Sequence, residues 1–305
     1  MKKLVALSLT MMLSFSLAAC GSSDSSSSNA DTPSGNQSQT DNSQADDSDQ
    51  SDSQANDAGA DNDANNDSST DSDTNYVKEK GSLIVGITDF EPMDYKDADG
   101  NWIGFDADMA KAFAESLNVS VEFVEINWDN KIMELDAKNI DCVWNGMTLT
   151  DEVTSSMECS NAYCNNAQVV IVPADKADQY QDIESIKELN FAVESGSAGE
   201  EQAKLNELAY TPVQQQSNAL MEVAAGTCDA AIIDSLMAAA MVGEGTGYEN
   251  LTYTIGLNDE KYGVGFRKGS DLAATLNDFF AASYADGSML KCAESYHVQA
   301  AVVKQ

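Results

Sequence analysis

Residues 82–124 read SLIVGITDFEPMDYKDADGNWIGFDADMAKAFAESLNVSVEFV and contain one complete strand–helix–strand pattern. The apolar run at 82–87 follows a glycine and predicts a buried strand. Apolar residues then recur at helical spacing from Met109 to Leu117, and the run at 119–124 predicts a second strand. This order of elements is typical of an α/β fold.

Two smaller features lie inside this stretch. Asp97-Ala98-Asp99-Gly100 predicts a turn. Its acids could also suggest a calcium loop, but the spacing does not match the full EF-hand template, so we favour the turn. Asp106 comes just before the helical pattern, and we expect it to cap that helix at its N-terminus.

The same alternation continues along the chain. Further strands are predicted at 141–145, 191–193, 211–213 and 229–233, and further helices at 130–135, 197–208, 217–225, 234–241, 272–284 and 289–296. Two α/β units in tandem predict two lobes. Each lobe would turn strand ends and helix N-termini toward a shared cleft, where open α/β sheets bind ligands.

The N-terminus has the features of an export signal. Two lysines precede an apolar run at 4–17 that is too short to span a bilayer, and Leu17-Ala18-Ala19-Cys20 follows it. This ending resembles the bacterial lipobox, in which the cysteine is acylated. An ordinary signal peptide with a chance cysteine is the alternative. We expect a signal peptide at 1–19 and a lipid on Cys20 that anchors the protein to the extracellular face of the cell membrane.

The next segment is strongly polar. Residues 21–75 contain thirteen aspartates and no lysine, arginine or glutamate. Such a segment cannot bury enough apolar surface to offset its ordering entropy, so we predict a disordered tether at 20–75. The whole chain has 51 acidic and 16 basic residues, a net charge of −35. No nucleic-acid partner is expected, because phosphate binding depends on lysine and arginine.

Cysteine and histidine usage argues against metal chemistry. Apart from Cys20 the cysteines are Cys142, Cys159, Cys164, Cys228 and Cys292. We expect buried thiols that pack as small apolar groups, with a bridge between Cys159 and Cys164 left open. His297 is the single histidine, so neither a zinc site nor a histidine-based triad is expected. The sequence thus offers neither a metal-based nor a histidine-based catalytic set, and no cofactor is expected, although acid–base work by two carboxylates stays conceivable.

Eight short motifs occur in one order between residues 83 and 269. They are LIVGIT at 83–88, FEP at 90–92, GFDADMA at 104–110, ID at 140–141, NGMTLT at 145–150, VESGS at 193–197, CDAAIID at 228–234 and YGVGFRKG at 262–269. In this order, the span 82–297 resembles the extracellular solute-binding proteins of family 3, the polar amino-acid type that serves ABC importers.

The resemblance implies a clamp of the type II periplasmic-binding-protein kind. Lobe one would comprise 76–170 and 266–305, and lobe two 171–265. The resemblance places two hinge strands at 168–172 and 263–267. They would cross between the lobes, and the lobes would close on the solute. The implied partners are a small solute and ABC permease subunits, and a monomer is expected. An extracellular sensor that uses the same clamp is the alternative to a transporter subunit.

The resemblance also carries eight residues into the candidate ligand site: Phe90, Trp128, Asn145, Gly146, Thr148, Glu194, Ser197 and Asp234. Phe90 and Trp128 would cover the ligand, although core packing is an alternative for Phe90. Asp234 would pair with the ligand amine, and capping of the next helix is its alternative role. On that basis Asp234→Ala should abolish ligand-induced stabilisation without unfolding the protein. Trp144, one position before Asn145, is expected in the core.

One departure from the family leaves the ligand open. The family has an arginine after the Thr-x-Thr turn that clamps a carboxylate, and this chain has Val153 there. Its single arginine, Arg267, matches a position outside the pocket, while Glu194 adds an acid where the family often has an apolar residue. An amino acid, held through the helix start at 197–199 and Thr148 with Lys131 nearby, is the favoured solute. A carboxylate-free cation, such as an amine or polyamine, is the alternative.

Overall fold

The computed structural model describes residues 72–305. The predicted signal peptide, Cys20 and most of the predicted tether lie outside these residues. The described helices are α1 Asp73–Lys80, α2 Phe105–Ser116, α3 Lys131–Asp136, α4 Asp151–Ser156, α5 Ile183–Ile186, α6 Ala198–Leu205, α7 Gln216–Ala225, α8 Ser235–Met241, α9 Leu272–Ala285 and α10 Ser288–Ser295, with 3-10 turns η1 Trp128–Asn130 and η2 Ala174–Gln179. Within 72–305, no helix has the length and apolar character needed to cross a bilayer.

Lobe one is built on a mixed sheet with the strand order β4-β1-β5-β13-β6, and β7 also pairs with β13. Its strands are β1 Ser82–Ile87, β4 Ser120–Glu125, β5 Cys142–Thr148, β6 Glu158–Cys159, β7 Cys164–Asn166 and β13 Glu260–Phe266. β1 pairs in parallel with both β4 and β5, and β13 runs antiparallel to β5. Chain order thus reverses between β1 and β5, a switch point where open α/β sheets present a crevice at their strand ends.

Lobe two repeats this arrangement in a sheet with the order β10-β9-β11-β8-β12. Its strands are β8 Gln168–Pro173, β9 Asn190–Glu194, β10 Ala209–Val213, β11 Ala230–Asp234 and β12 Leu251–Gly256. β9 is parallel to β10 and β11, and β8 is antiparallel to β11 and β12. A second switch point therefore lies between β9 and β11, and the two-lobe α/β clamp is confirmed.

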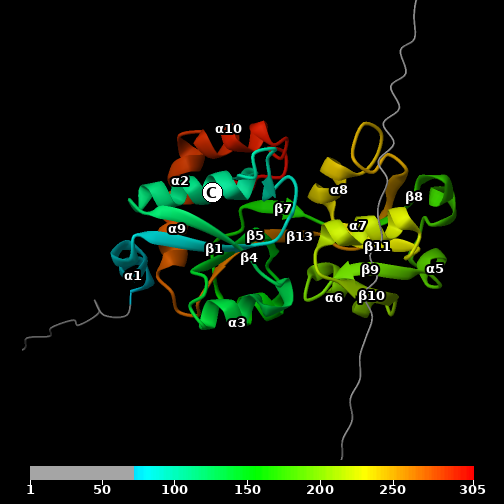
Figure 1. Cartoon of the computed structure of the whole chain (residues 1–305), viewed down its shortest axis with the longest axis horizontal. Coiled ribbons are helices and arrows are strands. Elements are labelled where there is room, and N and C mark those ends of the chain that lie inside the picture. The colour runs from blue at the N-terminus through cyan, green and yellow to red at the C-terminus, as the bar shows by residue number, and fades with distance from the viewer. Residues whose placement is uncertain (1–71) are drawn as a thin grey trace, which may run out of the picture. The chain divides into compact units, whose positions relative to one another are not determined.

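Helices cover both sheets (Figure 1). Helices α2, α9 and α10 pack together beside lobe one's sheet, and α6 and α7 pack on β9 and β11 in lobe two. The central strands β1, β5, β9 and β11 are almost wholly buried, which explains their continuous apolar runs. Trp144 is confirmed as a core residue: it is 1% exposed and its ring packs near the rings of Phe113, Tyr163 and Phe280.

The chain crosses between the sheets twice, a few residues before the positions expected from the sequence. β7 belongs to lobe one and β8 to lobe two, so the first crossing is at Ala167. The second lies between Gly256 and Glu260. The ranges expected to cross, 168–172 and 263–267, each lie mainly within one sheet. The apolar residues in these two ranges indicate that the strands are buried, but they do not indicate which sheet each strand joins.

The folded part begins earlier than the predicted boundary at Tyr76. Helix α1 starts at Asp73, and the Ser72 side chain caps it by accepting a hydrogen bond from the Asn75 N–H. Asp271, before α9, accepts bonds from the Ser72 hydroxyl at 2.5 Å and the Thr74 N–H at 2.9 Å. Polar residues that signalled disorder by composition are here used as a helix cap.

Two local predictions have different outcomes. The turn at 97–100 is confirmed: it joins β2 Tyr95–Lys96 to β3 Trp102–Ile103, and the Asp97 carboxylate accepts the N–H of Asp99. The prediction that Asp106 caps a helix is wrong, because α2 starts at Phe105 with Gly104 at its cap. The buried Asp106 carboxylate instead accepts the Gly146 N–H at 2.7 Å and the Tyr163 hydroxyl at 2.6 Å.

The five cysteines within 72–305 are all free thiols. Cys159 and Cys164 therefore form no bridge. Three of the five, Cys142, Cys164 and Cys228, are buried as predicted, and Cys159 and Cys292 are partly exposed.

Candidate functional site

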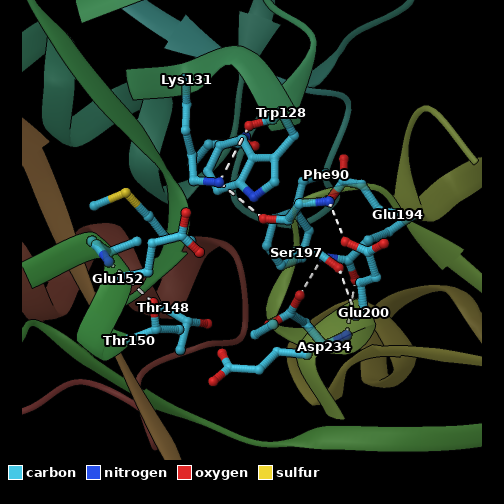
Figure 2. Close-up of a pocket in the computed structure, with 18 of the residues that line it drawn as sticks. Phe90, Trp128, Lys131, Thr148, Thr150, Glu152, Glu194, Ser197, Glu200 and Asp234 are labelled. Carbon is cyan, nitrogen blue, oxygen red and sulfur yellow. Dashed lines mark hydrogen bonds between the residues drawn. The ribbon is translucent and has the colours of Figure 1, made fainter. Parts of the chain in front are cut away.

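A cavity of about 240 Å³ lies where the two switch points face each other (Figure 2). Lobe one contributes residues after β1, along β5 and from η1 and α3. Lobe two contributes the ends of β9 and β11 and the starts of α6 and α7. All eight candidate residues line this cavity: Phe90, Trp128, Asn145, Gly146, Thr148, Glu194, Ser197 and Asp234. Its size suits a small solute.

Two aromatic side chains form part of the cavity wall. Phe90 is only 2% exposed, and its ring lies so close to Gly146 that a Cβ there would come within 2.4 Å of it. Gly146 also has φ +54°, so both space and backbone favour glycine at this position. Trp128 opens η1, and the Lys131 ammonium lies 5.1 Å from its ring centroid. Phe90 thus packs against Gly146 of β5 and also lines the cavity.

The polar groups of the β5 turn already have protein partners. The Asn145 side chain bonds Thr88 and donates to Asp94 at 2.8 Å, and the Gly146 N–H is used by Asp106. The Thr148 hydroxyl donates to Glu260 at 2.8 Å. The resemblance places Asn145, Gly146 and Thr148 of this turn in the ligand site. In the structure its groups are satisfied by three acids that the chain brings in from elsewhere, so the turn shapes the wall.

The start of α6 is likewise occupied by the protein itself. Ser197 caps the helix by accepting the Glu200 N–H at 3.2 Å. The Glu200 carboxylate accepts the Gly196 N–H at 2.9 Å and pairs with Lys204 at 3.1 Å. This acid neutralises part of the positive end of the helix dipole. The first-turn N–H groups of Ala198 and Gly199 have no intrahelical partner.

Lys131 is the buried cation of the cavity. Its ammonium donates to the Trp128 carbonyl at 3.3 Å and, across the cleft, to the Gly196 carbonyl at 2.9 Å. Burial lowers its pKa, and nearby acids led by Glu152 oppose that shift. Gly196, with φ +72°, lies against Asp129 of lobe one, where a Cβ would come within 2.8 Å of the backbone. The two lobes therefore touch at this point.

Val153, which the resemblance places where the family has its carboxylate-binding arginine, lines the cavity. Arg267 lies elsewhere: it donates to the Ile140 carbonyl at 2.9 Å and pairs with Asp73 at 3.0 Å. It therefore ties α1 to lobe one, as its predicted place outside the pocket requires. The cavity is lined by five acids and two lysines: Glu152, Glu194, Glu200, Glu201, Asp234, Lys131 and Lys204.

Asp234 is the most heavily hydrogen-bonded acid of the cavity. Its carboxylate accepts from the side chains of Asn166, Gln168, Gln216 and Tyr262, the last at 2.7 Å. Burial raises its pKa well above the usual value, and the neighbouring Glu260 carboxylate adds to the increase. Although Asp234 precedes α8, its side chain makes no capping bond, so the alternative role as a cap is not realised.

Glu194 is buried with much weaker support. It ends β9, is 2% exposed, and its Oε1 atom has no hydrogen-bond partner. Burial, followed by the charge of Asp234, raises the pKa of Glu194 to about 8, while Lys131 opposes the increase. Acid–base catalysis usually relies on two groups whose pKa values are pushed apart. Here the pKa values of Glu194 and Asp234 are both raised, and burial is the main cause in each case.

Sequence reasoning missed several lining residues. Glu152, Glu200, Glu201, Lys204 and Gln216 line the cavity but were not proposed for the site. Gln216 had a usable signal, because it follows a predicted strand and directly precedes a predicted helix, a placement similar to that of Ser197. Glu152 also had a usable signal, because it directly precedes Val153, the residue that stands in place of the family's carboxylate-binding arginine.

Comparisons with known proteins agree with this geometry. The pattern of the bacterial extracellular solute-binding proteins, family 3, matches residues 83–299. The L-cystine-binding protein TcyJ of Escherichia coli (strain K12) is 26% identical over 231 residues, covering 73% of this chain and 85% of that protein.

Two solved structures are similar in fold. A substrate-binding protein of an ABC uptake transporter from Streptococcus pneumoniae, with bound histidine, is 26% identical with a TM-score of 0.68, covering 75% of this chain and 98% of that one. The ancestral amino acid-binding protein AncCDT-1, a precursor of cyclohexadienyl dehydratase, is 31% identical with a TM-score of 0.67, covering 74% and 99%.

Proposed function

Because this chain belongs to the bacterial extracellular solute-binding proteins, family 3, we propose that it is the substrate-binding lipoprotein of an ABC importer. It captures a small amine-bearing solute, an amino acid, between its two lobes and delivers it to permease subunits. It acts as a monomer and as a binding protein without catalysis. The eight candidate residues contact the solute, and the lobe boundaries follow the two crossings.

One observation carries the proposal. Two buried carboxylates, Glu194 and Asp234, end the central strands of lobe two and face a cavity covered by Phe90 and Trp128. Buried acids require a cation or a proton. A solute amine supplies the cation, and aromatic faces attract it further. The carboxylate of an amino acid then faces Lys131 and the N–H groups of Ala198 and Gly199 at the start of α6, which have no intrahelical partner.

A carboxylate-free cation is a second candidate, and the altered clamp favours it. Val153 offers no donor for a carboxylate. Glu200 already occupies the start of α6, and Lys131 already donates to two carbonyls. An amine or polyamine avoids placing a carboxylate next to these acids. Relatives that bind histidine and L-cystine favour the amino acid.

Thermal shift measurements on the soluble domain, which comprises residues 72–305, test the function. A solute present at about 100 times its Kd adds about 2.7 kcal/mol, which for a domain of this size corresponds to about 5–10 °C. We expect such a shift with at least one member of a panel of amino acids, amines and polyamines, and none with the dicarboxylate succinate. A panel without any stabilising compound would contradict the proposed function. Stabilisation by amines alone would select the second candidate.

The anchor is tested separately. Cys20→Ser removes the proposed acylation site, and we expect the protein to leave the membrane fraction for the soluble fraction on expression in a bacterial host. Cys292→Ser is the matched control, because this partly exposed thiol lies in α10. Equal membrane retention of the Cys20 variant and the control would refute the lipid anchor without affecting the solute proposal.

A further inference from the structure

Glu194 differs from every other acid that lines the cavity. Its Oε1 is buried without a partner, whereas Asp234 beside it accepts from four side chains. A carboxylate offers about four lone-pair positions, so the protein fills those of Asp234 and leaves the Oε1 atom of Glu194 open. Buried polar atoms in native proteins are nearly always bonded. The open oxygen of Glu194 is therefore the position at which the protein lacks a partner.

We propose that Glu194 directly binds the cationic group of the solute and gives up a proton to the solvent as that group enters. The inference rests on the proposed function, since it takes this cavity as the solute site. In the exchange, the O–H bond of the Glu194 carboxyl breaks and its proton passes to water. An ammonium or guanidinium N–H of the solute then donates to the carboxylate, and no covalent bond to the solute forms.

The groups around Glu194 explain why its carboxyl group carries a proton when no cationic solute is bound. Asp234 on β11 adds negative charge that raises the pKa of Glu194, whereas the charge of Lys131 from α3 and a side-chain hydrogen bond from Gln216 at the start of α7 lower it. Glu200 and Glu201 of α6 line the same cavity. Burial, followed by the charge of Asp234, raises the pKa of Glu194 to about 8, so the empty site carries the proton at neutral pH.

This exchange gives the affinity a defined pH dependence. Below the pKa of Glu194 a cation has to displace a proton, and its affinity falls by up to about tenfold for each pH unit. Above that pKa the carboxylate is already charged and no proton is released. The cation can be the amine of a carboxylate-free solute or a group of an amino acid, and L-arginine and agmatine separate these sources because they differ only in the carboxylate.

Calorimetric titration of the soluble domain with L-arginine and with agmatine, in two buffers of different ionisation enthalpy, measures this exchange. At about pH 6 we expect nearly one proton released per molecule bound, and affinity roughly 50-fold lower than at about pH 8. Glu194→Gln should release no proton and should bind at about pH 8 at least about tenfold more weakly than wild type. Glu188→Gln, an exposed acid of the same lobe, is the control.

The outcomes are separable. Proton release with either compound supports the assignment, and the compound that gives it identifies the source of the cation. Binding by wild type without proton release at about pH 6 overturns the assignment and leaves the proposed function intact. Proton release that persists in Glu194→Gln also overturns it. The wild-type proton count needs no variant, so a misfolded variant does not remove the test. Failure of wild type to bind either compound, or any member of the wider panel, overturns the proposed function itself.

Discussion

Replacing Asp234 with alanine is expected to lower the free energy of unfolding by about 3–5 kcal/mol in the absence of any solute. The variant would leave buried donors of Asn166, Gln168, Gln216 and Tyr262 without the acceptor they share. These donors come from both lobes, because Asn166 and Tyr262 belong to lobe one and Gln168 and Gln216 to lobe two. The loss should therefore destabilise the junction between the lobes. Urea unfolding of the solute-free domain measures it.

This expectation differs from the one that the sequence supports, which is a loss of binding without unfolding. Asp259→Asn is the matched control, since Asp259 is an exposed acid in the second crossing. Asp234→Asn keeps the volume and one acceptor oxygen, so it should cost less than alanine. An unchanged urea midpoint for Asp234→Ala would show that the four donors do not depend on this carboxylate.

Raising the pH from about 4.5 to about 8 is expected to destabilise the solute-free protein by on the order of 4 kcal/mol. Burial raises the pKa of Asp94, Asp106, Glu194 and Asp234, to about 7 for Asp106 and about 8 for Glu194. In this window the folded state holds more protons than the unfolded chain. Stability is thus fully present below the unfolded pKa and is lost as pH rises through the folded pKa. Most proteins instead lose stability toward acid.

Unfolding midpoints at several pH values check this direction. Glu194→Gln should flatten the curve between about pH 5 and about pH 8, because it removes one of the groups responsible. The net charge of −35 adds surface repulsion with the same sign. That part is screened at about 1 M salt, whereas the contribution of buried groups persists. A stability that rises with pH across this window would contradict the assignment of buried, protonated acids.

The repeated strand–helix rhythm was predictable because buried strands and amphipathic helices leave a local pattern. The placement of the eight candidate residues around one cavity was predictable from the motif resemblance, and strand-end position supported Asp234, because a fold of this kind brings strand ends to one cleft. Helix α1 was missed, since its first turn is polar and is stabilised by Asp271, about 200 positions away along the chain.

Hydrogen-bond partners inside the site could not be predicted from local patterns. Asn145 meets Asp94, 51 positions away, and Asn166 meets Glu260, 94 positions away. From the sequence alone, a polar residue near a cleft looks available to bind a ligand. Only the fold shows which acid already accepts its hydrogen bond. The difference between Asp234 and Glu194 is of this kind, because both are acids at strand ends and only their neighbours set them apart.

The start of α1 has a mechanical consequence. Ser72 and Thr74 are bonded to Asp271, and α1 packs on β1 and α9, none of which belongs to lobe two. Under the proposed lipid anchor, the membrane attachment therefore joins the folded part at lobe one. Lobe two is joined to it through the two crossings, so closure on the proposed solute would move lobe two relative to lobe one and its attachment. A permease that contacts lobe two would then detect solute binding as a displacement of lobe two relative to the membrane.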